Sequence, residues 1–127
     1  MTTLLFLDDR REPDQVIDLA MYSRILLARK AEDAMALVVE QPRFDVWSLD
    51  HDLAAGVQGR RLRRQVKTGF DFLVWALEHA RGKMPGRILV HSANPWGRRR
   101  MLDLLSEARA QAVRRMLDLY PDDDCNA

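Results

Sequence analysis

Acidic and imidazole side chains stand directly after three short apolar runs of this sequence. The three polar groups are Asp8-Asp9 after residues 4–7, Asp50-His51-Asp52 after residues 44–49, and His91-Ser92-Ala93-Asn94 after residues 88–90. Carboxylates and imidazoles gathered at one place repel one another and lose hydration unless a cation or a proton-sharing ligand compensates them. Their types therefore indicate a site for metal-assisted or acid–base chemistry.

The carboxylates suit a hard divalent cation. Asp8, Asp9 and Asp50 offer the oxygen ligands that magnesium takes together with waters and phosphate oxygens, with Asp52 in support. Zinc favours His or Cys at clear spacings, which this chain lacks. The site is therefore expected to bind Mg²⁺ or another divalent cation.

The histidines offer a second chemistry. Neutral His51 could take a proton from water or a ribose hydroxyl while protonated His91 gives one to a leaving oxygen. Imidazole has a pKa near ~6.5, so such a pair can divide these roles near neutral pH. Both residues also have a structural interpretation as buried histidines without a catalytic role.

Two further features favour a phosphate ligand. The segment from Ser92 to Arg98 leads into a predicted helix N-terminus, where free N–H groups bind anions. Basic runs at residues 60–67 and 98–100 flank the expected crevice, although such runs are also common on solvated surfaces. Likewise, Asp9, Ser92 and Asn94 could be simple helix caps.

The apolar runs that carry these residues predict four strands, at residues 4–7, 24–28, 44–49 and 88–90. Apolar periodicity predicts helices that begin near Pro13 and cover residues 30–41, 69–81 and 95–119. Regular alternation of strand and helix predicts an α/β fold, an open parallel sheet with helices on both faces. Because ligands bind at the carboxyl ends of such strands, the three polar groups are expected to converge in one crevice.

Length and composition indicate one domain spanning residues 1–127, with a basic insert at about 54–68 and an acidic tail at 121–127. The net charge of +1 means that anion binding must come from a local patch. The single cysteine, Cys125, cannot form an internal disulfide. Without a signal-peptide pattern or a long apolar stretch, a cytoplasmic location away from membranes is expected.

The placement of these residues resembles the response-regulator receiver domain. In that family paired acids after the first strand bind magnesium, an aspartate after the third strand accepts phosphate, and a Ser or Thr ends the fourth. Asp8, Asp9, Asp50 and Ser92 match these positions. Two departures stand out, since this chain lacks the fifth strand that carries the receiver lysine and embeds Asp50 between Ser48 and Leu53.

The sequence is similar, more closely, to the cyclic-phosphate processing receiver-like family. The blocks that carry the similarity are Leu7-Asp8-Asp9-Arg10, Leu49-Asp50-His51-Asp52-Leu53, Thr68-Gly69-Phe70-Asp71, and His91-Ser92-Ala93-Asn94-Pro95 with Gly97 and Met101. This resemblance implies a receiver-like, flavodoxin-like sheet and a role on cyclic phosphates of RNA ends or nucleotides. The long basic insert before Thr68 is the main departure, and it could lengthen a substrate groove or bind a partner.

Two functions follow as expectations. The first is a phosphoesterase-like hydrolase acting on cyclic phosphates, in which His51, His91 and Asp50 are catalytic and Asp8, Asp9 and Asp50 hold metal. Phosphate would be bound by Thr68, Ser92, Asn94 and Arg98, together with the insert arginines. In a variant of this function, Asp50 forms an aspartyl-phosphate. The alternative is a non-catalytic signalling or interaction module that binds a phosphate ligand or a protein partner, and the long final helix could pack in a homodimer.

Overall fold

The computed structural model describes residues 2–119, so the acidic tail at 121–127 and Cys125 lie outside the described residues. Its four strands are β1 (Thr3–Leu7), β2 (Arg24–Ala28), β3 (Val46–Leu49) and β4 (Arg87–Val90). They form one sheet in the order β2-β1-β3-β4, and every pair is parallel. The predicted four-stranded parallel sheet of receiver type is therefore confirmed.

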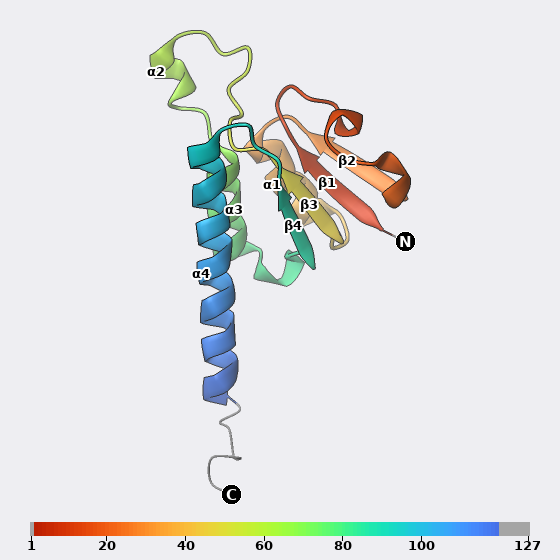
Figure 1. Ribbon diagram of the computed structural model, residues 1–127, viewed down its shortest axis with the longest axis vertical. Helices are drawn as coiled ribbons and strands as arrows, with labels where there is room; N and C mark the ends of the chain where they lie inside the picture. The colour runs from red at the N-terminus through yellow and green to blue at the C-terminus, as the bar shows by residue number, and fades with distance from the viewer. Residues whose placement is uncertain (1, 120–127) are drawn as a thin grey trace, which may run out of the picture.

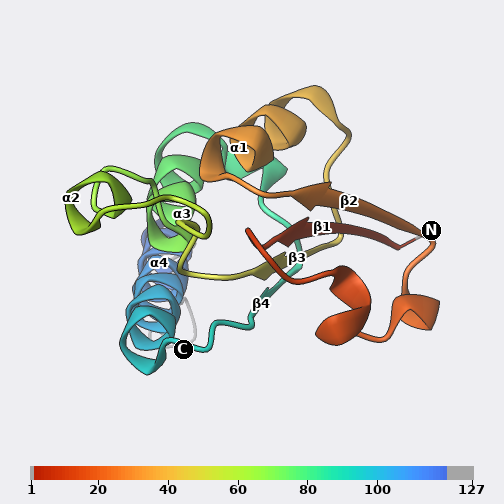
Figure 2. The same cartoon turned by 90° about the horizontal axis from the view of Figure 1, so that it is seen from above.

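The α-helices gather on one face of this sheet (Figure 2). They are α1 (Ala31–Glu40), α3 (Gly69–His79) and α4 (Pro95–Leu119), and α3 packs between α1 and α4. The 3-10 turn η3 (Arg81–Lys83) follows α3, and the four-residue helix α2 (Arg60–Arg63) stands out from the body in the basic insert (Figure 1). The insert is thus a loop that contains one short surface helix.

The opposite face carries only two 3-10 turns, η1 (Pro13–Gln15) and η2 (Leu19–Met21). The sequence favours one continuous helix there, but Glu12 and Gln15 close a capping box around the first turn. The side chain of Asp18 then accepts a hydrogen bond from Ala20 N and starts the second turn. Helical turns therefore cover both faces, but the caps divide this segment into two short pieces.

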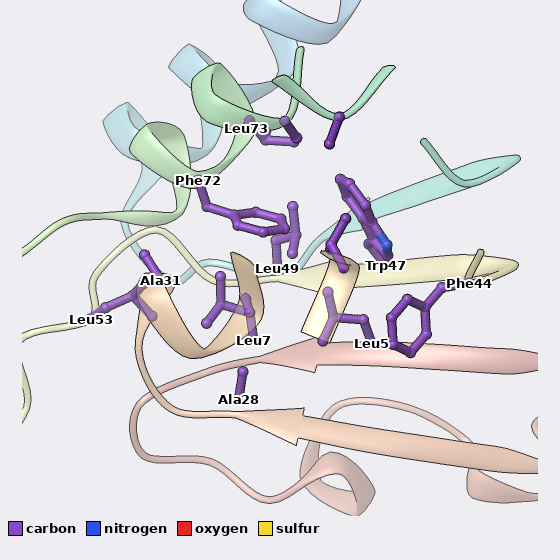
Figure 3. Packing of buried hydrophobic residues seen from close by; sticks show 14 of the residues in the cluster. Leu5, Leu7, Ala28, Ala31, Phe44, Trp47, Leu49, Leu53, Phe72 and Leu73 are labelled. Atoms are coloured by element: carbon purple, nitrogen blue, oxygen red, sulfur yellow. The ribbon is translucent and has the colours of Figure 1, made fainter. Parts of the chain in front are cut away.

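Side chains alternate between the two faces along each strand, as strand geometry requires. The helix-covered face buries Leu5, Leu7, Trp47 and Leu49 against Phe72 and other side chains of the main core (Figure 3). The other face buries a smaller cluster of Leu4, Phe6 and Val46 beneath the two 3-10 turns. Burial on both faces explains why the strand sequences are continuously apolar.

The final helix α4 extends well past the sheet (Figure 1). Its first half contributes buried Met101 and the partly buried Leu104 and Leu105 to the core. From Arg109 to Asp118 every side chain is exposed, including Val113, Met116 and Leu117. Among residues 2–119, no helix combines the length and the apolar composition that crossing a bilayer requires.

Candidate functional site at the carboxyl ends of the strands

The carboxylate of Asp8 is buried directly after β1, where its two oxygens accept four hydrogen bonds. Oδ1 accepts from the backbone N–H groups of Arg10 and Arg11, at 2.9 and 2.8 Å. Oδ2 accepts from Arg11 Nε and His91 Nε2, each at 3.0 Å. Burial opposes ionisation, but the hydrogen bonds and the Arg11 charge keep the pKa of Asp8 below its ordinary value. Asp8 is therefore a fixed anion at neutral pH.

The carboxylate of Asp50 is buried after β3 and shares Arg11 with Asp8. Arg11 Nη2 lies 3.7 Å from Asp50 Oδ1, which also accepts the backbone N–H of His51 at 2.8 Å. Burial, followed by the negative charge of Asp8, raises the pKa of Asp50 to about 6 against the opposing effects of His51, Arg11 and Ser92. Asp50 can therefore exchange a proton near neutral pH, whereas Asp8 cannot.

The ring of His91, directly after β4, links this edge strand to β3 and to the segment that follows β1. Its Nε2 lies 3.0 Å from Asp8 Oδ2 and its Nδ1 lies 2.7 Å from Ser48 Oγ, while the ring stacks on Phe6 at 4.8 Å. A carboxylate only accepts, so Nε2 donates to Asp8 and Nδ1 can accept from the Ser48 hydroxyl of a neutral ring. Burial lowers the pKa of His91, consistent with the neutral form. Both nitrogens are thus engaged, Nε2 with Asp8 and Nδ1 with Ser48.

The ring of His51 lies beneath the start of α4. Its Nδ1 lies 2.7 Å from Asp52 Oδ1, so that nitrogen donates to the carboxylate. Its Nε2 is enclosed and has no hydrogen-bond partner among the described residues. A Cβ added at Gly97 would stand 2.4 Å from the His51 ring, so only glycine permits this close packing. The start of α4 therefore packs against the Cγ, Nδ1 and Cδ2 atoms of the ring.

An open cavity of about 520 Å³ lies in front of these groups. The carboxylates of Asp9, Asp50 and Asp52 line it together with Thr68 and Asn94. Five arginines also line it, namely Arg10 and Arg11 after β1 and Arg60, Arg63 and Arg64 in the basic insert. Neither histidine ring lines this cavity, because both pack behind it.

The four expected phosphate-binding residues lie in two adjoining hollows. Thr68 and Asn94 line the main cavity, whereas Ser92 and Arg98 line a smaller hollow of about 360 Å³; the two hollows share Ala93. Thr68 caps α3 by accepting from Asp71 N, and Asn94 Oδ1 accepts from Gly97 N at the start of α4. Asn94 Nδ2 also donates to Asp52. The capping interpretation of Asn94 is therefore confirmed, and a ligand-binding role remains a prediction.

The three expected metal ligands do meet. Asp8, Asp9 and Asp50 can each place one carboxylate oxygen within 4.8 Å of the others. The donor set consists of oxygens alone, which suits a hard divalent cation. Asp8 is already saturated with hydrogen bonds and Arg11 lies between Asp8 and Asp50, so the more available ligands are Asp9 and Asp50. The cluster could therefore hold a metal ion that shares its charge with Arg11.

Two residues of the site were not identified from sequence. Arg11 neutralises Asp8 and Asp50, and Ser48 holds the ring of His91. Residues 8–11 are not helical, so the i, i+3 pairing rule for helices does not apply and Arg11 had no local sequence signal. Ser48 interrupts an apolar strand, and a buried hydroxyl needs a partner nearby.

Comparison with known protein families gives a match to the cyclic-phosphate processing Receiver domain over residues 3–107. The matched region contains all four strands, the carboxylate cluster and the first half of α4. Searches of curated proteins and of solved structures returned no significant match.

Proposed function

Because this chain belongs to the cyclic-phosphate processing receiver family, we propose that it hydrolyses cyclic phosphates on RNA ends or nucleotides. In such a reaction a water oxygen forms a new bond to phosphorus and one ribose–phosphate ester bond breaks. The product is a phosphomonoester, and the released ribose oxygen takes up a proton from solvent. The reaction needs a proton acceptor for the water and cations for the phosphoryl oxygens.

The observation that carries this proposal is the position of Asp50. Its carboxylate lines the cavity and has a pKa of about 6, so it is ionised at neutral pH and still able to accept a proton. Arg11 stands beside it, and the arginines of the insert line the same cavity. These groups supply a base and positive charge within one solvent-open space.

In this proposal the two histidines act through their neighbours. His91 fixes Asp8, and His51 holds Asp52 next to the cavity. His51 is the second candidate for the base, because Asp52 orients Nδ1 and leaves Nε2 as the basic atom. That role requires the groups around Nε2 to move, since this atom is buried in the structure.

A divalent cation fits the carboxylate cluster chemically. Asp9 and Asp50, with Asp8 behind them, would hold it, and the ion would supply Lewis-acid polarisation of a phosphoryl oxygen. Magnesium is the cation that we propose, because the ligand atoms are all carboxylate oxygens.

The proposal is tested with 2′,3′-cyclic mononucleotides in the presence and absence of Mg²⁺ or Mn²⁺. Phosphomonoester formation by the wild-type protein, lost in Asp50→Asn but retained in Asp14→Asn on the exposed turn η1, would support it. Hydroxylamine trapping of a phosphorylated protein would instead indicate the aspartyl-phosphate variant at Asp50. Absence of product with every metal, alongside measurable binding, would contradict catalysis.

One observation favours the alternative function. Both nitrogens of His91 are engaged and His51 Nε2 is enclosed, so the cavity presents no free imidazole from these two residues. A non-catalytic receiver-like module would need only the phosphate-binding walls. For either function we propose a cytoplasmic location. We also propose a homodimer formed through α4, because the outer half of this helix leaves Val113, Met116 and Leu117 exposed.

A further inference from the structure

The main cavity carries more positive charge than one cyclic phosphate requires. Five arginines and three aspartates line it, whereas a cyclic phosphate on a mononucleotide has a single negative charge. Arg11 is already paired with Asp8 and Asp50, but Arg60, Arg63 and Arg64 form no ion pair with any described carboxylate. These three cations therefore remain available for further anionic groups.

Helix α2 and its C-cap residue Arg64, which has helical backbone angles, carry these three arginines. Residues 60, 63 and 64 follow the i, i+3, i+4 spacing of one helix face, and this face lines the cavity. Arg61 belongs to the same helix but does not line the cavity. Gly59, which precedes the helix with a φ of +86°, allows the chain to turn there. The positive charge of Arg60, Arg63 and Arg64 is thus concentrated at the cavity rather than spread evenly over the insert.

Nothing in the insert neutralises this face. No Asp or Glu occurs between Asp52 and Asp71, and residues 59–65 are all exposed. Arginines that are held close together without counter-charges repel one another, and a row of phosphates removes that repulsion. Guanidinium groups also match phosphate oxygens in geometry and hydrogen bonding.

We propose that Arg60, Arg63 and Arg64 bind the phosphodiester groups that precede the reactive terminus, so that the preferred substrate is the 3′ end of single-stranded RNA. This inference rests on the proposed function for the identity of the terminal group. The cyclic phosphate occupies the end of the cavity at Asp9 and Asp50. The preceding nucleotides run outward along Arg60, Arg63 and Arg64. A mononucleotide fills the first position alone and gains nothing from α2.

The neighbouring hollow gives an internal comparison. Arg98 lies there, on the other side of Ala93, and does not line the main cavity. If the strand leaves along α2, Arg98→Gln should reduce the preference for longer RNA less than twofold. If Arg98→Gln had an effect equal to or larger than that of the substitutions at Arg60, Arg63 and Arg64, the strand would leave through the neighbouring hollow. That result would overturn the proposal.

The experiment measures binding of RNAs of one, two, four and eight nucleotides that end in a 2′,3′-cyclic phosphate, at several salt concentrations. Wild-type affinity should rise at least tenfold from one to four nucleotides, with a salt slope that steepens by about 0.7 for each phosphate bound. The triple substitution R60Q/R63Q/R64Q should remove most of this gain. The single substitution R61Q keeps the cavity face intact and should keep the gain. Circular dichroism verifies folding, and α2 is exposed enough for these variants to fold.

Several results would overturn the proposal: affinity independent of length, an equal loss in R61Q, or competition by a poly-glutamate peptide as strong as that by RNA. The last result would point to an acidic protein partner. Failure of the proposed hydrolysis is distinguishable, because turnover of the cyclic mononucleotide reports on the reaction alone. Length-dependent, α2-dependent binding without turnover would support this inference while contradicting the enzyme.

Discussion

Arg11 Nε lies 3.0 Å from Asp8 Oδ2, and this ion pair places a fixed cation inside the carboxylate cluster. The same guanidinium approaches Asp50, so it occupies part of the space in which a metal would balance charge. Arg11 is therefore expected to weaken metal binding while it stabilises the empty cluster. Metal occupancy and the Arg11 conformation should be coupled.

The first prediction concerns this competition. Arg11→Gln should tighten Mn²⁺ or Mg²⁺ binding by about tenfold, because one positive charge is removed beside Asp8 and Asp50. It should also lower the free energy of unfolding in metal-free buffer by about 1–3 kcal/mol. Isothermal titration calorimetry or electron paramagnetic resonance of Mn²⁺ measures the metal affinity. Arg10→Gln is the control, since Arg10 lines the cavity but forms no ion pair with the described acids. Weaker metal binding in Arg11→Gln would contradict the competition.

The second prediction concerns the pH dependence of stability. The pKa of Asp50 is about 6 in the folded protein and near its ordinary value of 3.8 when unfolded. Between these values the folded state binds more protons, so the contribution of Asp50 to stability is full below pH 4 and is lost as pH rises through 6. Asp50→Asn should therefore raise the free energy of unfolding by about 2–3 kcal/mol at pH 8.

The size of this effect should itself depend on pH. Near pH 4 the protonated acid and the amide carry the same charge, so the gain from Asp50→Asn should vanish there. Urea unfolding at pH 4, 6 and 8 measures the trend, with Asp14→Asn on the exposed turn η1 as the control. A gain that is constant across this range would mean that the Asp50 charge is not its source.

The third prediction separates a positioning role of His91 from a catalytic one. His91→Ala removes the donor to Asp8, the partner of Ser48 and the stack on Phe6, so a loss of about 2–4 kcal/mol is expected. Ser48→Ala should cost about 1 kcal/mol, because it leaves only His91 Nδ1 unsatisfied. If His91 acts only through Asp8, the acidic limb of the pH–rate profile of hydrolysis reports on Asp50. Its midpoint should then stay near pH 6 in Ser48→Ala. A limb that moves with the Ser48 substitution would assign the titration to His91.

The sequence predicted that the site residues come together, but it did not predict how each side chain is oriented. Apolar strands ending in acids sufficed to predict that Asp8, Asp9 and Asp50 meet, because parallel strands bring their carboxyl ends to one edge. The direction of each side chain depends on contacts between elements. His91 is turned inward by Ser48 of the neighbouring strand, and the ring of His51 packs against Gly97 of α4. A hydroxyl within an apolar strand indicates that Ser48 has a partner but not which one, and the contact of Gly97 with His51 has no local sequence signal.

The fourth prediction concerns that approach of Gly97 to His51. Helix propensity alone predicts that Gly97→Ala near the start of α4 stabilises the protein by up to about 1 kcal/mol. The structure predicts the opposite sign, because the added Cβ would stand 2.4 Å from the His51 ring. A loss of about 2–4 kcal/mol is expected, with a displaced His51 resonance in NMR spectra. Gly82→Ala meets open space and is the control; a stabilised Gly97→Ala would show that α4 shifts freely.

The fifth prediction tests the proposed homodimer. The outer half of α4 exposes Val113, Met116 and Leu117, which share one helix face. A helical segment of this length is marginal in water without packing, so a second α4 is the partner that we expect to cover this face. Light scattering should give a dimer for the wild-type chain and a monomer for Met116→Glu. Gln111→Glu adds the same charge on the opposite side of the helix and should leave the dimer intact. If the wild-type chain stays monomeric at about 100 times the protein concentration of the hydrolysis assay, the dimer would be contradicted. The exposed face of α4 would then be free for another partner.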